Sequence, residues 1–434
     1  MPKLKAEMAK RSNFSKQVLG NGLTVLTERH EQFRGMSLGM WVKVGTRHEA
    51  TSVAGVSHFL EHMLFKGTAR RTALDIAREI DQVGGDFNAF TAREYTCFHL
   101  LILDRDLNLG LDILTDVLMN STFSAEEFER ERRVILQEIS MVAESPEELL
   151  FDLFFERVYA GHGLGRPILG TPHSIRRMSR AKMVRFFRNY YRPDQMVFSI
   201  AGNVDAASVK RKLGALRNSR WPGRPLRQSK APVSVLPAPR SGLWWEQRAT
   251  EQVHLAWGVP GLPYGARDRF AMLLLNVYLG SGMSSTLFQE IREKKGLAYS
   301  VYSSVAAFVD TGMFTVYAAT GMKQVAVCLR LIEECVARVE RELLSAEDLS
   351  MIKNNLKGTI LLSADDVESR MMSIAKNDLF LGKQTAVAEV CRQIDEVTPQ
   401  DIRRVARRLF RADRSILALG PKPPRDLLAK LPFS

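Results

Sequence analysis

The chain has 434 residues, of which 45% are hydrophobic and 25% charged, the balance of an ordinary globular protein. This length exceeds what one hydrophobic core comfortably supports, so we expect two domains or more. No apolar run reaches the roughly 18 residues that a membrane-spanning helix needs. The net charge is +13, but the basic residues are dispersed and the sequence contains no nucleic-acid-binding motif. We therefore expect neither a membrane span nor a nucleic-acid partner.

The N-terminal segment and the cysteines bear on the compartment. Residues 1–16 are basic but lack the apolar stretch of a secretory signal, so export by that route is not expected. A mitochondrial presequence would carry few acidic residues, whereas this short segment includes Glu7. The four cysteines form no CxxC pair, which indicates buried thiols in a reducing compartment rather than disulfides or a cysteine zinc site. These features predict a cytoplasmic protein, with the mitochondrial matrix as the alternative.

The predicted elements occur twice in the same order. Each half begins with a strand pattern that alternates apolar and polar residues and ends at glycine, at residues 37–45 and 252–261. A helix and further strands follow, the latter at residues 88–103 and 299–319. Each half then has a helix that starts with a capping box, formed by Ser124 with Glu127 and by Ser345 with Asp348. The repeated order predicts an internal duplication.

The duplication leads to a prediction of fold and domains. We expect an α+β protein of two homologous domains, each an antiparallel sheet covered by helices. The N-terminal domain is predicted at residues 1–215 and the C-terminal domain at 243–434, joined by a linker at 216–242 that is rich in Pro, Arg and Ser. A parallel βαβ design would also fit the alternation of elements. Residues 86–103, however, leave no room for a crossover helix between strands.

The pentad His58-Phe-Leu-Glu61-His62 in the first half predicts a metal site. On a helix, side chains four residues apart lie on the same face, so both imidazoles can reach one ion while Glu61 lies beside them. Catalytic zinc usually has three protein ligands and a water, and this pentad is the inverted form of the HExxH signature. The alternative is two surface histidines and an unrelated glutamate on an amphipathic helix. The apolar residues that flank the pentad favour a buried setting and therefore a ligand group.

The capped helix after residue 123 offers the third ligand. Glu138 interrupts an apolar run there, which suits an inward-facing carboxylate with a partner. Glu131 lies seven residues earlier, so both carboxylates face the same way. Read alone, Glu138 would be a structural residue, but with the pentad it completes a His₂Glu zinc set. Glu131 is then predicted to orient a ligand or the metal.

These residues resemble the pitrilysin/insulinase family of zinc peptidases, in particular members similar to the mitochondrial processing peptidase β subunit and its bacterial relatives. In that family an HxxEH pentad is followed at a set distance by a glutamate ligand. The interval between His62 and Glu138 matches that distance, and Glu131 matches a glutamate seven residues before the ligand. The segments GVSHFLEHMLFKGT, GGDFNAFT and ERERRVILQEI agree in order and spacing, so the resemblance covers essentially the whole chain.

The resemblance implies further site residues. Family members bind peptide by adding it to the edge of a strand, here matched by Asn88, Ala89 and Phe90, although a turn leading into an ordinary strand is the alternative. In the family an Arg and a Tyr of the second domain bind substrate, and the tyrosine hydroxyl stabilises the oxyanion. Arg292 and Tyr299 match both, whereas pattern alone would make this segment a helix end. The two domains of family members enclose a chamber.

The predicted function is therefore that of a zinc metalloendopeptidase that hydrolyses peptides or unfolded polypeptide segments. One Zn²⁺ per chain is held by His58, His62 and Glu138, and Glu61 activates the attacking water. The alternative is a non-catalytic structural or partner subunit of the same fold. A homodimer, or a heterodimer with a related subunit, is compatible with the resemblance, and a bacterial cytoplasm is the expected location.

Overall fold

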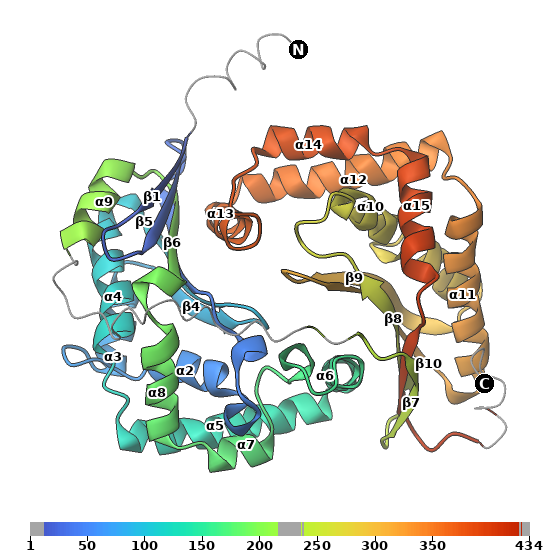
Figure 1. The fold of residues 1–434 in the computed structure, drawn as a ribbon, viewed down its shortest axis with the longest axis horizontal. Coiled ribbons are helices and arrows are strands. Elements are labelled where there is room, and N and C mark those ends of the chain that lie inside the picture. Colours follow the sequence, from blue (N-terminus) through green and yellow to red (C-terminus); the bar gives the residue numbers. More distant parts are fainter. Residues whose placement is uncertain (1–12, 216–235, 237, 425–426, 428–434) are drawn as a thin grey trace, which may run out of the picture. The chain divides into compact units, whose positions relative to one another are not determined.

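The computed structural model describes residues 13–215, 236, 238–424 and 427, and the chain divides into two compact units (Figure 1). Unit 1 consists of Met1–Ile139, Pro167–Val233 and Ser363–Gln384; unit 2 consists of Ser140–Arg166, Ser234–Leu362 and Thr385–Ser434. The units differ from the contiguous halves of the sequence because each half contributes one segment to the other unit. Most of the predicted linker 216–242 lies outside the described residues, so the predicted boundaries of the sequence domains stay predictions.

Unit 1 is built on a six-stranded sheet in the order β1-β2-β6-β3-β5-β4. All neighbours are antiparallel except β2 and β6, which run parallel. Side chains along the strands alternate between a main core on one face of the sheet and a smaller apolar cluster on the other face. Their bounds are Phe14–Val18 (β1), Thr24–Arg29 (β2), Gly35–Val42 (β3), Asp86–Thr91 (β4), Thr96–Leu103 (β5) and Met196–Gly202 (β6).

Helices cover the main-core face of this sheet (Figure 1). Ser124 begins the longest of them, α5, because its hydroxyl accepts a hydrogen bond of 3.1 Å from the amide of Glu127, at the predicted cap. The boundary between the units falls inside α5, after Ile139. The helices of this half are α2 (Val56–Leu64), α3 (Ala73–Gln82), α4 (Leu107–Asn120), α5 (Ala125–Glu144), α6 (Pro146–Val158), α7 (Pro172–Arg177), α8 (Arg180–Tyr190) and α9 (Ala206–Ala215).

Unit 2 repeats the plan with a five-stranded sheet in the order β7-β11-β8-β10-β9, again with one parallel pair, β7 and β11. The cap predicted at Ser345 is present, since its hydroxyl accepts from the amide of Asp348 at 3.0 Å. The strands are β7 (Gly242–Gln247), β8 (Val253–Gly261), β9 (Ala298–Ala307), β10 (Gly312–Thr320) and β11 (Ser415–Gly420). The helices of this half are α10 (Arg269–Gly280), α11 (Val325–Arg341), α12 (Ala346–Ala364), α13 (Val367–Leu381), α14 (Val387–Glu396) and α15 (Pro399–Phe410).

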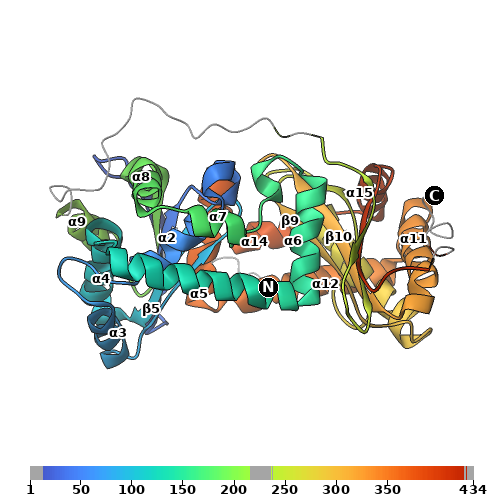
Figure 2. The same cartoon turned by 90° about the horizontal axis from the view of Figure 1, so that it is seen from below.

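Each unit receives one helix from the opposite half of the sequence. Helix α13 packs on the sheet of unit 1, where Met371 lies so close to Gly39 that a Cβ there would be 2.4 Å from the Met371 sulfur. Helix α6 packs on the sheet of unit 2, visible in Figure 2, where a Cβ on Gly258 would lie 2.7 Å from the Phe154 ring. Glycine is therefore required at both strand positions for the helices to approach this closely.

The predicted fold class, α+β with two homologous domains of helices and mostly antiparallel sheets, is confirmed. The prediction did not include the parallel pair in each sheet. That pair arises because the last strand of each half returns beside an early strand, after enough chain for a crossover has intervened. Within the described residues, none of the helices combines the length and apolar character that crossing a membrane requires.

Candidate metal centre

The N-terminus of α2 is held in place by a glycine and a buried carboxylate. Gly55, just before the helix, has a φ of +87°, and a side chain there would lie 2.7 Å from the carbonyl oxygen of Leu169. The buried carboxylate of Glu49 accepts hydrogen bonds from the amides of Gly55 (2.7 Å) and Ser57 (2.8 Å). The first amides of a helix have no partner within the helix, so Glu49 satisfies two of them. Its negative charge also interacts favourably with the positive end of the helix dipole. The other face of α2 packs into the main core through Phe59, Leu60, Met63 and Leu64.

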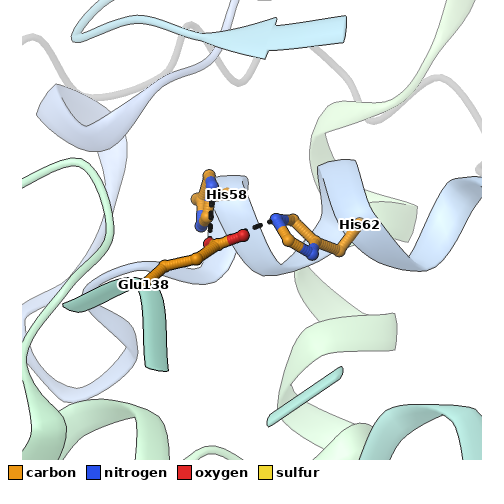
Figure 3. Close-up of side chains that lie close together, drawn as sticks. All are labelled: His58, His62 and Glu138. Carbon is orange, nitrogen blue, oxygen red and sulfur yellow. Dashed lines mark ion pairs between the residues drawn. The ribbon is translucent and has the colours of Figure 1, made fainter. Parts of the chain in front are cut away.

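Three predicted ligands meet between α2 and α5, as Figure 3 shows. An oxygen of Glu138 (Oε2) lies 3.5 Å from His62 Nε2 and 3.8 Å from His58 Nε2, and one ligand atom from each residue lies within 4.8 Å of the others. Two donors that each bind zinc at about 2.0–2.2 Å in a tetrahedral arrangement are roughly 3.3–3.6 Å apart. The three side chains are thus close to the spacing that a single zinc ion requires.

The chemistry of these donors also fits zinc. Burial, followed by the charge of His62, lowers the pKa of His58 to about 3, so His58 is neutral. Neutral imidazole is the form that binds metals. Two histidines and a glutamate form one of the common donor sets of catalytic zinc, which leaves a fourth position for water or substrate. The residues present therefore fit the ion.

Glu131 orients His62 rather than joining the ligand group. Its Oε2 lies 3.0 Å from His62 Nδ1 and can accept the proton of that nitrogen. In the neutral form of His62 this hydrogen bond leaves Nε2, which lies 3.5 Å from Glu138 Oε2, able to bind a metal. Lys66 Nζ lies 2.8 Å from the other oxygen of Glu131. Burial raises the pKa of Glu131, but the hydrogen bonds to His62 and Lys66 outweigh it and the pKa falls. Glu131 is thus ionised, and its contacts with His62 and Lys66 hold it in place.

Glu61 points toward the edge strand β4. The hydroxyl of Thr91 donates a hydrogen bond of 2.5 Å to its Oε2. Burial raises the pKa of Glu61, and although Thr91 and His62 lower it and Glu138 raises it, the net shift is upward. A carboxylate with a raised pKa beside a metal group has the character of a general base.

Strand β4 holds the three residues that we expected to bind peptide. It lies at the edge of the sheet, and in the described part of the chain it pairs with β5 alone. Ala89 packs against the main core, and the Phe90 ring stacks edge-on against Trp41 at 5.8 Å. The exposed Asn88 side chain accepts a hydrogen bond from the Ala89 amide at 2.8 Å. Among the described residues, the strand therefore has one edge with which no other strand pairs, and a peptide could join it there.

Arg292 and Tyr299 lie together in unit 2. The Arg292 guanidinium lies 4.9 Å from the centre of the Tyr299 ring, which is 77% exposed. Arg292 belongs to a turn of π-helix, Phe288–Glu293, and the segment ends at Gly296 with a φ of +59°. This arrangement fits the interpretation as a helix end. It also fits a substrate-binding role, because an exposed ring beside a guanidinium can contact a peptide.

Sequence reasoning missed three residues that support the centre: Glu49 at the start of α2, Lys66 beside Glu131, and Thr91 beside Glu61. Lys66 and Thr91 fall inside segments that carried the family resemblance, but no local pattern assigned them a role. Glu49 has no signal in the sequence, because its partners are backbone amides.

Comparisons of the sequence identify a matching family and relatives that are named zinc proteases. Residues 24–172 match the family model described as Insulinase (Peptidase family M16), and residues 177–356 match the model described as Peptidase M16 inactive domain. An uncharacterized zinc protease of Bacillus subtilis is 36% identical over 401 residues, which cover 92% of this chain and 97% of that protein. Another, of Streptomyces coelicolor, is 40% identical over 410 residues, which cover 93% of this chain and 88% of that protein.

Solved structures share the fold. A protease from Helicobacter pylori has a TM-score of 0.86 at 20% identity, and the match covers 94% of this chain and 99% of that one. A peptidase M16 inactive domain from Pseudomonas fluorescens has a TM-score of 0.87 at 19% identity, covering 95% and 99%. At such identities the likeness concerns the fold alone.

Proposed function

Because the chain belongs to the insulinase family, peptidase family M16, we propose that it is a zinc-dependent endopeptidase that hydrolyses peptides or unfolded polypeptide segments. The observation that carries the proposal is the meeting of His58, His62 and Glu138 beside the half-buried carboxylate of Glu61. Relatives that align over nearly the whole chain are named zinc proteases, which supports the same chemistry.

The ligand group is proposed to hold one Zn²⁺ per chain. His58 and His62 would bind it through Nε2, and Glu138 through a carboxylate oxygen. When bound, zinc lowers the pKa of a water molecule toward neutrality and polarises the carbonyl group of the peptide bond. Glu131 keeps His62 in the tautomer that presents Nε2, and Lys66 keeps Glu131 ionised.

Glu61 is proposed as the general base. Its carboxylate accepts the proton of the attacking water and later delivers that proton to the nitrogen of the departing amine. Burial favours both proton transfers, because it raises the pKa of Glu61. The proton affinity of the carboxylate is then closer to that of the water and of the departing amine.

Substrate binding is proposed to use the free edge of β4 and the Arg/Tyr pair. An extended peptide that joins the edge at Asn88, Ala89 and Phe90 would satisfy backbone hydrogen-bonding groups that the sheet leaves open. Arg292 is proposed to bind the peptide. The Tyr299 hydroxyl is proposed to stabilise the negative charge that develops on the carbonyl oxygen.

We further propose a cytoplasmic location in a bacterium, which the bacterial source of the named relatives supports. A homodimer or a heterodimer with a related subunit stays part of the proposal, and size-exclusion chromatography with light scattering would distinguish these states.

The direct test incubates the zinc-loaded protein with a mixed peptide library and sequences the products by mass spectrometry. We expect internal cleavage, its loss when a chelator removes the metal, and its return when zinc is restored. A protein that binds about one zinc per chain but cleaves no peptide would contradict the proposal and favour the alternative of a non-catalytic partner subunit.

A further inference from the structure

The contact between α2 and β4 carries a role that the family resemblance did not assign. We infer that Thr91 is a positioning residue for Glu61, and that it fixes the base to the strand that receives the peptide. The inference rests on the proposed function, since it assumes that Glu61 is the base.

One face of β4 is directed to α2. Side chains along a strand alternate between faces, so Phe87, Ala89 and Thr91 lie on the same side. Phe87 and Ala89 pack against the main core, and the Phe87 ring lies 4.7 Å from that of Phe65, immediately after α2. Thr91 contacts Glu61 near the other end of the strand. Strand β4 is thus fixed to α2 at two points, one apolar and one polar.

The hydroxyl of Thr91 determines which oxygen of Glu61 is available. It donates to Oε2 at 2.5 Å, and among the described residues it is the only hydrogen-bond partner of that carboxylate. The hydrogen bond therefore fixes the orientation of the Glu61 carboxylate and leaves Oε1 available to accept the proton of the attacking water. A hydrogen bond to an ionised group is stronger than one between neutral groups, so it restricts the rotation of the long side chain. General-base catalysis depends on such placement within hydrogen-bond reach.

The same contact links the base to the substrate strand. Thr91 is the last residue of β4, and its side chain points to α2, away from the open edge that a peptide would join. A peptide paired with β4 would use backbone groups and would not contact the Thr91 hydroxyl. Removal of that hydroxyl should therefore change the chemical step and leave peptide binding intact.

The test compares Thr91→Val, which keeps the β-branched shape, with the wild type and with Thr91→Ser, which restores a hydroxyl. For Thr91→Val we expect kcat to fall on the order of 10- to 100-fold, a part of the 10²–10⁴ that a general base supplies. KM, zinc content and melting temperature should stay near wild type. Thr91→Ser should recover most of kcat. Crystal structures of the zinc-loaded wild type and Thr91→Val provide a readout besides activity, with Glu61 directed to Thr91 only in the wild type.

A matched control is Thr96→Val, which changes the residue paired with Thr91 across the β4–β5 ladder. The Thr96 hydroxyl donates to the Val44 carbonyl at 2.9 Å and does not contact Glu61, so kcat should stay near wild type. An equal loss of kcat in Thr96→Val, unchanged kcat in Thr91→Val, or a wild-type crystal in which Glu61 turns from Thr91 would each overturn the inference. Absence of cleavage by the wild type, with Glu61 held by Thr91 in the crystal, would instead overturn the proposed function.

Discussion

Helix α2 follows β3 in the first half and helix α10 follows β8 in the second half, yet the two helices carry very different side chains. Helix α2 directs His58, Glu61 and His62 to one side and buries apolar residues on the other. Helix α10 buries apolar side chains along most of its length and contains no histidine or carboxylate. Apolar packing alone is thus enough to hold such a helix in the fold, whereas the proposed metal chemistry needs histidines and a glutamate, which α2 has and α10 lacks.

The helices that each half contributes to the other unit differ much less. The second residue of each is a glutamate that contacts the sheet beneath it. Glu368 of α13 lies 3.1 Å from His99 Nδ1, and Glu147 of α6 accepts a hydrogen bond of 2.6 Å from the Tyr302 hydroxyl. The duplicated halves therefore retain their packing arrangement while their chemistry differs. The predictions below test whether the chemistry of α2 can be removed without the packing.

The largest effect is expected for His58→Ala, which makes α2 resemble α10. Zinc content should fall from about one per chain to near zero, because two ligands cannot hold the ion in the presence of a competing chelator. The metal-free protein should still fold, since α10 shows that ligands are not needed for packing. Metal analysis and circular dichroism measure the two outcomes. His173→Ala, at an exposed position of α7, is the matched control and should retain zinc.

A smaller but still large effect is expected for Glu61→Gln, which separates chemistry from metal binding on the same helix. Glutamine cannot accept the water proton, so turnover should fall on the order of 10²–10⁴-fold. Zinc content should stay at the wild-type level, because Glu61 is not one of the three proposed ligands. Turnover of a cleaved library peptide and metal analysis give both values. Near wild-type turnover would mean that another group takes the proton.

Tyr299→Phe tests whether unit 2 contributes chemistry despite its inert α10. Loss of one oxyanion donor costs roughly 10²–10³ in kcat. Folding and zinc content should not change, because the Tyr299 ring is exposed. Arg292→Ala should mainly raise KM, since its proposed partner is the peptide. Tyr278→Phe, on α10 of the same unit, is the control. Full activity in both test variants would mean that Arg292 and Tyr299 are only part of a helix end.

The smallest of these effects is expected for Glu131→Gln, which leaves every ligand in place. The amide is a weaker acceptor for the His62 Nδ1 proton, so zinc affinity should fall about 10–100-fold. Competition with a chromophoric chelator measures the dissociation constant. Glu126→Gln, on the exposed face of the same helix, should have no effect. An unchanged affinity in Glu131→Gln would show that His62 is oriented by packing alone.

Some of the site is readable from sequence because its geometry is local. His58 and His62 share a face by helical periodicity, and α5 begins at the predicted Ser124 cap. Glu138 lies on another helix, so its meeting with the histidines follows from the family resemblance and is seen only in the fold. Lys66, by contrast, is close in sequence to His62, but its role depends on Glu131 in α5.

The duplication, the fold class and the pentad could be predicted from the amino-acid sequence, because periodicity, caps and ligand spacing act over a few residues. The packing of α6 and α13 on the sheet of the opposite half, and the contacts of Glu49 and Thr91 with α2, are seen only in the folded chain. These contacts join residues far apart in the chain or use backbone amides as partners. No local pattern encodes such pairings, because they form only when the sheets and helices have been brought together.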